Sequence, residues 1–571
     1  MKNCLCSELS TCSKKEFAQR KAPQKFAGLF YFDYIIKIKM KLKKKQFNLD
    51  LDRAKTNVLE GKLYQAINLL FKLEEIKPDD AEVKLYLGSA LTKNGEHLQA
   101  IRVLKNAIEI SPNLFNLHYA IGVANFELKN YHEALQAFER EINLNPKNYF
   151  AYLESGYSLY ELEEYNAAIN FLEKAITLDA DCADAFHCMA ATLNNLERYQ
   201  EAFSNILRAI EIDNTQSEYY FCLGNIFASI KNNKEALKSF ERALEIDPLN
   251  NEIIYNKGLI HFYNLNFKEG WECYEKRRKV SEYLKKTESL NKLYLKQIPE
   301  DHEPILLYSE QGIGDQIIYL SLLHEAIALP NPILVQIEPR LIPLFKRSYP
   351  DVNFFSDKET LDPSLYKYHG LVGSIPHLFR NSKESFLNQK KSFLISDPNK
   401  TLALRNRLTA KDRLVCGVAW KSKNEKFGHF KTASLLDFLP VLKLPSINFI
   451  DLQYGDTSEE RSNLKNEHSV ALSKINDIDN FNDIDGLASL IDACDFIVTI
   501  SNATAHIAGA LGKKVFLMVP YEKGRIWYWH DGLKTSLWYP TIEIFTQNEI
   551  GDWSVPINEI KEKIVEEILH E

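Results

Sequence analysis

The apolar positions in the first half of the chain follow a helical period and form pairs of segments that recur every 34 residues. Prolines close the second segment of several pairs, and glycines and alanines keep the same register. These positions are Pro78, Pro112, Pro146 and Pro248; Gly88, Gly122, Gly156, Gly224 and Gly258; and Ala66, Ala100, Ala134, Ala168, Ala202 and Ala236. Small side chains let two helix axes approach closely, and proline stops a helix. The pattern therefore predicts stacked helix pairs over residues 47–284, six units and a partial seventh.

This pattern resembles the tetratricopeptide repeat. The resemblance implies a curved solenoid whose inner face binds an extended peptide. A spacer or a dimerisation arm is the alternative, and the sequence does not separate the two. In the seventh unit Gly270 stands where an alanine is due, and Trp271 and Tyr274 indicate a cap that packs against another part of the chain. Residues 285–303 are predicted to form a linker.

After Pro304 the pattern changes to short apolar runs, which predict buried strands, alternating with helical segments. Such alternation is typical of parallel sheets covered by helices on both faces. The fold class is therefore an α-solenoid followed by α/β structure. We expect one Rossmann-like domain over 304–411 and a second over 412–571, the latter ending in a closing helix. In parallel sheets, ligands bind where strands end and helices begin.

The first strand-to-helix junction, SEQGIGDQ, contains Gln311, Gly312, Gly314 and Asp315. It lacks the third glycine of a dinucleotide fingerprint and the Gly-Lys-Ser/Thr of a P-loop. The glycines permit close approach of the backbone to a ligand. Asp315 has two interpretations from local sequence, an N-cap of the following helix or a general base facing a cleft.

The second junction, TISNATAHIAGALG, puts Ser501, Asn502, Ala503 and Thr504 at a helix start. Small residues and free backbone N–H groups there suit a phosphate. His506, one turn further, is either a ligand contact or a packed histidine. The stretch GVAWKSKNEKFGHFK is rich in lysine and includes Lys421 and Lys431, and lysines in such a loop are commonly solvated.

Together the two junctions resemble the heptosyltransferase-type GT-B glycosyltransferases, over about residues 304–555. The resemblance implies that Asp315 is the catalytic base and that the segment from Ser501 to Gly512 binds a nucleotide sugar. It also implies that a basic residue meets the donor diphosphate, for which Lys421 and Lys431 are the candidates. Ser501-Asn502 replaces the family's Asp-Thr. Bacterial proteins that join tetratricopeptide repeats to such a domain share further motifs, found here at Glu269–Arg277, Glu310–Asp315, Leu452-Gln453 and Trp538–Pro540.

The charge and composition of the chain limit the kinds of partner and cofactor that we expect. The 571 residues carry a net charge of −7, which does not favour nucleic acid. Residues 1–46 are basic and are predicted to be a disordered leader, or a mis-called start upstream of Met40. The nine cysteines lack paired spacing, so neither zinc nor disulfides are expected. No stretch is long and apolar enough to span a membrane, which favours a cytoplasmic protein.

The predicted function is inverting, metal-independent glycosyl transfer from a nucleoside-diphosphate sugar to a protein or large glycan presented by the repeats, with no further cofactor. Asp483-Ile484-Asp485 mimics a metal-binding D-x-D motif, but its polar neighbours favour a solvated loop before a helix. The alternative function is a non-catalytic scaffold in which a transferase-like domain has lost its chemistry.

Overall fold

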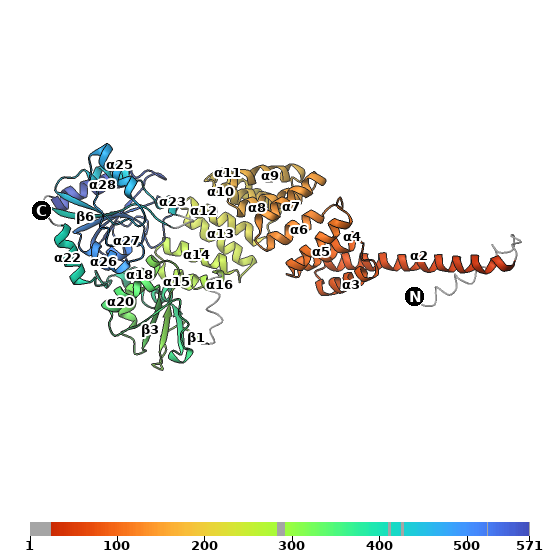
Figure 1. The fold of residues 1–571 in the computed structure, drawn as a ribbon, viewed down its shortest axis with the longest axis horizontal. Coiled ribbons are helices and arrows are strands. Elements are labelled where there is room, and N and C mark those ends of the chain that lie inside the picture. Colours follow the sequence, from red (N-terminus) through yellow and green to blue (C-terminus); the bar gives the residue numbers. More distant parts are fainter. Residues whose placement is uncertain (1–23, 282–291, 409–412, 424–427, 522, 570–571) are drawn as a thin grey trace. The chain divides into compact units, whose positions relative to one another are not determined.

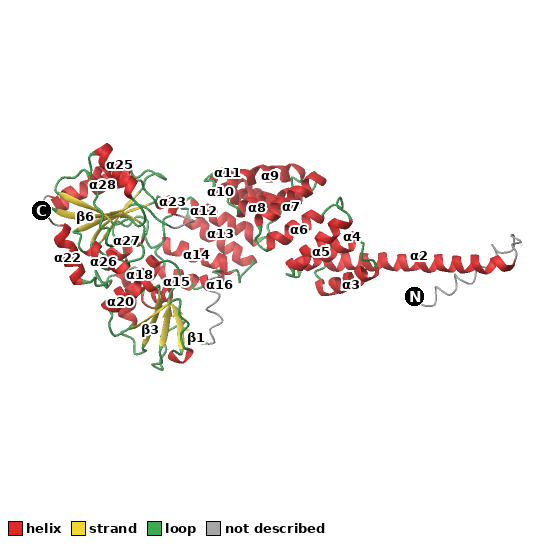
Figure 2. Cartoon of the chain, viewed as in Figure 1, coloured by secondary structure: helices red, strands yellow, loops and turns green. Residues whose placement is uncertain are grey.

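The computed structural model describes residues 24–281, 292–408, 413–423, 428–521 and 523–569. The chain divides into two compact units, 1–214 and 215–571. Figures 1 and 2 show that the first unit is helical and that the second joins further helices to two sheets. Within the described ranges, none of the helices combines the length and the apolar character needed to cross a bilayer.

The first unit consists of five pairs of successive helices, the first of them formed by α2 and α3, as the 34-residue period predicts. α2 spans Gln24–Leu59, followed by α3 (Leu63–Ile76), α4 (Ala81–Lys93), α5 (His97–Ile110), α6 (Leu117–Glu127), α7 (Tyr131–Leu144), α8 (Tyr149–Glu161), α9 (Tyr165–Leu178), α10 (Ala183–Asn195) and α11 (Tyr199–Ile212). The repeat glycines lie where two helices touch. A Cβ on Gly122 would come within 2.3 Å of the Phe138 ring, so a larger residue would force α6 and α7 apart.

The prediction of a disordered leader over 1–46 is wrong for its second part. α2 begins at Gln24 and continues without a break into the first repeat. The basic segment Lys41–Lys45 consists of residues with good helix propensity, and a helix can extend through it with these side chains in solvent. Residues 1–23 lie outside the described residues.

The turns within the helix pairs follow a second 34-residue series. Gly61, Gly95, Lys129, Glu163, Glu197, Lys231 and Leu265 all have positive φ, between 57° and 84°. Only the first two are glycine, although the left-handed region costs other L-residues about 1–2 kcal/mol. Each turn must reverse the chain in few residues. The left-handed backbone conformation is therefore kept even where the residue is not glycine and this conformation is unfavourable for it.

The second unit starts with α12 (Ser217–Ser229), α13 (Asn233–Ile246), α14 (Asn251–Tyr263), α15 (Phe267–Tyr274) and α16 (Arg277–Val280). The predicted cap packs as expected: Trp271 and Tyr274 are buried, and they join one continuous core with residues of both sheets. Trp271 donates its indole N–H to the carbonyl of Arg380 at 2.7 Å.

The first sheet is all-parallel and has the order β1-β5-β2-β3-β4. Its strands are β1 (Leu293–Tyr294), β2 (Ile305–Tyr308), β3 (Ile333–Ile337), β4 (Asn353–Ser356) and β5 (Tyr368–Leu371). Part of the predicted linker 285–303 is therefore a strand, because β1 pairs with β5 in parallel. Residues 285–291 lie outside the described residues.

The second sheet is also all-parallel, with the order β10-β9-β8-β6-β7. It consists of β6 (Leu414–Ala419), β7 (Ile447–Asp451), β8 (Phe496–Ile500), β9 (Lys514–Val519) and β10 (Ile542–Thr546). Both sheets carry helices, among them α18 (Ile313–Tyr319), α20 (Ile342–Ser348), α22 (Pro398–Leu408), α26 (Ile484–Asp492), α27 (Ala503–Ala510) and α28 (Ser554–Ile564). The short apolar runs correspond to β2, β3, β4, β6, β7, β8 and β9, and α28 is the predicted closing helix.

Candidate functional site

Each sheet has a point where the strand order reverses, and the candidate residues follow these points. In the first sheet β2 lies between β5 and β3; in the second β6 lies between β8 and β7. At such a switch point the loops diverge and leave a crevice at the carboxyl ends of the strands. The loop with Asp315 follows β2, and the loops with Lys421 and Asn502 follow β6 and β8. The two helices that start from these loops, α18 and α27, pack against each other.

Asp315 lies in the first turn of α18 and does two things at once. Its Oδ2 accepts the backbone N–H of Gly312 at 3.2 Å, so it caps the helix. Its Oδ1 accepts the hydroxyl of Tyr528 at 3.3 Å. Burial raises the pKa of Asp315 to about 6, although the Gly312 N–H and the charge of Lys431 act in the opposite direction. The N-cap residue of α18 is therefore Gly312, and Asp315 is the residue at the third helical position that bonds back to it, while its second oxygen faces Tyr528.

His506 lies opposite, on α27, and is almost fully buried. A Cβ on Gly314 would come within 2.7 Å of its ring, so only glycine allows α18 and α27 to approach this closely. The ring nitrogens lie 3.0 Å from the Tyr539 hydroxyl and 3.4 Å from that of Tyr528. Burial, together with the charge of Lys431, lowers the pKa of His506 to about 3. The imidazole is therefore neutral at physiological pH.

Of the two candidate lysines, Lys431 belongs to this group. It ends the short helix α23 (Gly428–Lys431), is only 4% exposed, and lies close enough to Asp315 for their charges to interact. Burial lowers its pKa. Within the described residues Lys431 makes no ion pair within 4 Å. Lys421, in contrast, forms an ion pair with Glu460 at 2.6 Å, and its side chain is 42% exposed. A buried ammonium without a carboxylate in contact is the stronger anion site.

The start of α27 is held by its own cap and by the neighbouring loop. Asn502 accepts the N–H of Ala505 at 3.3 Å and donates to the carbonyl of Lys421 at 3.4 Å. Thr504 is buried, and Ala503 is partly exposed. The Ser501 hydroxyl accepts the indole N–H of Trp529 at 2.9 Å, and Ser501 is 3% exposed. Trp529 therefore covers the position of Ser501.

The loop after β6 is fixed by Gln453, the glutamine that follows β7. Its Oε1 accepts the backbone N–H groups of Trp420 and Lys421 at 2.9 and 2.8 Å, and the side chain is fully buried. Asp451 in turn accepts the Gln453 N–H at 2.8 Å. The Leu-Gln motif therefore sets the path of the lysine loop.

The loop after β2 is tied to the cap of the repeats. Arg277 donates through Nε and Nη2 to the two carboxylate oxygens of Glu310, at 2.7 and 2.8 Å, and both side chains are buried. Glu310 also accepts the Gly373 N–H from the loop after β5. Gln311, which has φ 60°, donates to the Tyr274 hydroxyl at 2.9 Å. The motif Glu269–Arg277 in the cap and the motif Glu310–Asp315 therefore contact each other directly.

Tyr528 and Tyr539 are functional candidates that the sequence did not reveal individually. Tyr528 connects Asp315 to His506, and Tyr539 contacts the other ring nitrogen of His506. Both phenols are buried, which raises their pKa well above the ordinary value. The available signal is the dense aromatic run Ile526–His530, which is unusual for a loop.

The acidic pair considered as a metal motif has structural partners. Asp483 accepts the Gly486 N–H as N-cap of α26, and Asp485 forms a two-pronged ion pair with Arg347 at 2.6 and 2.9 Å. Among the described residues, no group of three or more His, Cys, Asp or Glu side chains is arranged to hold a metal ion. The six cysteines among the described residues are free thiols.

Comparison with known families identifies the repeats. Models described as TPR repeat or Tetratricopeptide repeat match residues 88–129, 115–148, 151–182 and 217–250. The helix pairs are tetratricopeptide repeats. Such repeats typically mediate protein interactions, and the prediction from the 34-residue period is confirmed.

Among known proteins, protein FlbA of Caulobacter vibrioides is 28% identical over 274 residues, which cover 44% of each chain. The chain thus matches less than half of the length of this curated relative. Solved structures with similar helical repeats include YrrB, a TPR protein with an unusual peptide-binding site (22% identity, TM-score 0.28, 33% of this chain and 97% of that one). Others are MamA from Desulfovibrio magneticus RS-1 (20%, 0.28, 30% and 96%) and the APC/C Cut9–Hcn1 hetero-tetramer (15%, 0.35, 41% and 46%).

Proposed function

We propose that the α/β region is a GT-B-type glycosyltransferase that moves a sugar from a nucleoside-diphosphate donor to a protein or glycan acceptor. The observation that carries this proposal is the meeting of Asp315, His506 and Lys431 where α18 faces α27. A carboxylate, a neutral imidazole and a buried cation together meet the needs of sugar transfer, which releases an anionic leaving group and a proton.

In the proposed reaction, the acceptor hydroxyl attacks the sugar carbon from the face opposite the diphosphate. The bond from that carbon to the diphosphate oxygen breaks, and the hydroxyl proton passes to the Oδ1 of Asp315. A pKa of about 6 leaves most of this carboxyl ionised at neutral pH while keeping it basic enough to take a proton. Configuration at the sugar carbon is inverted.

The donor diphosphate is assigned to the start of α27 and to Lys431. Backbone N–H groups at a helix start carry partial positive charge, and the ammonium balances the charge that develops on the leaving diphosphate. This arrangement gives the leaving group its counter-charge from the protein, so we propose that no metal ion is required. His506 is better suited to positioning Tyr528 than to carrying charge, because it stays neutral.

The proposed acceptor route runs along the repeats. The last repeat is joined to the Asp315 loop by the contacts of Arg277 and Tyr274 with Glu310 and Gln311. An acceptor held on the inner face of α14 would therefore meet the site without crossing a mobile linker. On this face Tyr255 packs against Tyr274, with ring centroids 5.6 Å apart.

A scaffold without chemistry is the second candidate, and Ser501 favours it. Its hydroxyl is occupied by Trp529, so it cannot contact a sugar as the family's aspartate does. Calorimetric titration with a panel of nucleoside diphosphates and nucleotide sugars separates the two. Transferase function predicts binding that Lys431→Met weakens at least about tenfold and that Lys443→Met, at an exposed lysine, leaves unchanged. Absence of binding by every nucleotide in the panel would favour the scaffold.

A further inference from the structure

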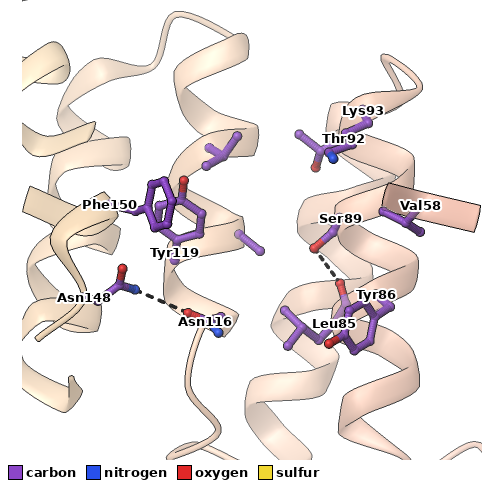
Figure 3. Close-up of a pocket in the computed structure, with 12 residues that line it drawn as sticks. Val58, Leu85, Tyr86, Ser89, Thr92, Lys93, Asn116, Tyr119, Asn148 and Phe150 are labelled. Atoms are coloured by element: carbon purple, nitrogen blue, oxygen red, sulfur yellow. Dashed lines mark hydrogen bonds between the residues drawn. The ribbon is translucent and has the colours of Figure 1, made fainter. Parts of the chain in front are cut away.

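The inner face of the first unit contains a cavity of about 410 Å³. It is bounded by the first helices of three successive repeats, α4, α6 and α8, and Figure 3 shows its two sides. Leu85 and Ser89 lie on one side; Tyr119 and Phe150 lie on the other. The size falls within the range of ordinary ligand sites. The cavity could hold one large side chain together with part of the backbone next to it.

Apolar and polar groups around the cavity are open to a ligand. Phe150 is 47% exposed although it is a large apolar side chain, and its ring stacks on Tyr149. The Asn148 side chain donates to the Oδ1 of Asn116 at 3.3 Å (Figure 3), and the side-chain Nδ2 of Asn116 and the side-chain Oδ1 of Asn148 make no hydrogen bond to the described residues. An apolar surface beside unused amide groups matches an extended peptide, which offers both side chains and backbone polar groups.

Next to Tyr119 the surface becomes acidic. Glu154 on α8 is partly buried and faces Glu127 at the end of α6 and Asp184 at the start of α10. Burial, and then the charges of Asp184 and Glu127, raise the pKa of Glu154 to about 7. Within the described residues, no cation lies within 4 Å of Glu154 and no donor hydrogen-bonds to its carboxylate. A partly buried carboxylate among like charges is destabilised until a cation pairs with it.

We propose that this face binds an extended protein segment with a large apolar residue in the cavity and a lysine or arginine at Glu154. Neighbouring helix axes are about 8–10 Å apart, and an extended chain rises about 3.3 Å per residue. One helix spacing therefore separates the two side chains by roughly two to three residues. The inference goes beyond the proposed transfer reaction and does not depend on it, because it concerns binding alone.

Fluorescence polarisation with short synthetic peptides and the full chain tests the proposal. The first probe carries phenylalanine about three residues before lysine, with serine and glycine elsewhere. The second has glutamate in place of the lysine, and the third has serine in place of the phenylalanine. We expect the first probe to bind at least about tenfold more tightly than either of the others. Its affinity should also increase from pH 6 to pH 8, as Glu154 loses its proton.

Three variants complete the test. Glu154→Gln should reduce binding of the first probe about tenfold and abolish the pH dependence, whereas Phe150→Ala should weaken every probe that carries phenylalanine. Glu109→Gln, on the outer helix α5, should change nothing. Equal binding of the lysine and glutamate probes, an unchanged Glu154→Gln, or no binding of any probe would each overturn the proposal.

Discussion

The ion pair between Arg277 and Glu310 should be one of the most costly contacts in the molecule to break. Arg277→Met removes two charge-assisted hydrogen bonds of 2.7 and 2.8 Å and leaves Glu310, whose side chain is 0% exposed, with the Gly373 N–H. Removing one partner of a buried pair costs about 3–5 kcal/mol, because the other charge stays desolvated. For a unit of this size that corresponds to a fall in the thermal midpoint of roughly 5–10 °C.

The exposed pair of Arg198 and Glu201 provides a matched control. It has the same two-pronged geometry, at 2.7 and 2.6 Å, but its side chains are 45% and 55% exposed. Arg198→Met should therefore cause a much smaller loss of stability. Differential scanning calorimetry, which reports on both units, follows the unfolding of the wild type, of Arg198→Met, of Arg277→Met, of Glu310→Gln and of the double variant of the last two. The cycle should give a coupling energy of at least about 2 kcal/mol. A coupling near zero, or equal losses for the two arginines, would refute the reasoning.

Three further predictions address the site and the repeats. Asp315→Asn should raise the thermal midpoint at pH 8, and the gain should vanish as the pH falls from 6 towards 4. The reason is that the pKa of this carboxyl is about 6 in the fold and 3.8 in the unfolded chain, so its ionisation destabilises the fold as the pH rises from about 4 to 6. A gain that does not depend on pH would contradict this reasoning. Gly314→Ala should destabilise by about 1–3 kcal/mol through contact with His506, whereas Gly312→Ala meets only an ordinary 3.5 Å contact; equal calorimetric midpoints would disprove the close approach. Glu163→Gly should stabilise by about 0.5–1 kcal/mol in urea unfolding by relieving its positive φ, and a gain for Glu163→Ala as well would exclude this cause.

The sequence predicts the repeats well because their constraints are local and periodic. Each repeat glycine is required by close contact with a side chain of its own helix pair, as Gly122 is by contact with Phe138. The pattern can therefore be recognised without knowing the fold. The strands were predictable for a similar reason, since both faces of a parallel strand are buried. β1, β5 and β10 were not predicted. β1 has only two residues, β5 contains His369 and Gly370, and in β10 the apolar residues alternate with Glu543, so none of them shows a continuous apolar run.

The site was predictable only in part, because it depends on contacts between distant segments. The glycines around Asp315 indicated close approach, but not that the approaching group is His506, which lies 191 residues further along the chain. The roles of Tyr528 and Tyr539 arise only once α27 and the aromatic loop meet α18. Similarly, the sequence places Arg277 and Glu310 in two separate motifs, and only the folded chain shows that they form an ion pair.

The rate at which nucleoside diphosphate is released from a nucleotide sugar, by the wild type and by Asp315→Asn, tests the central claim most directly. The account predicts that both proteins bind the donor with the same Kd, while the variant turns it over at least about 100-fold more slowly. It further predicts that the wild-type rate falls as the pH drops below about 6, because Asp315 becomes protonated. Full turnover by Asp315→Asn, or a wild type that neither binds nor cleaves any nucleotide sugar, would contradict the account.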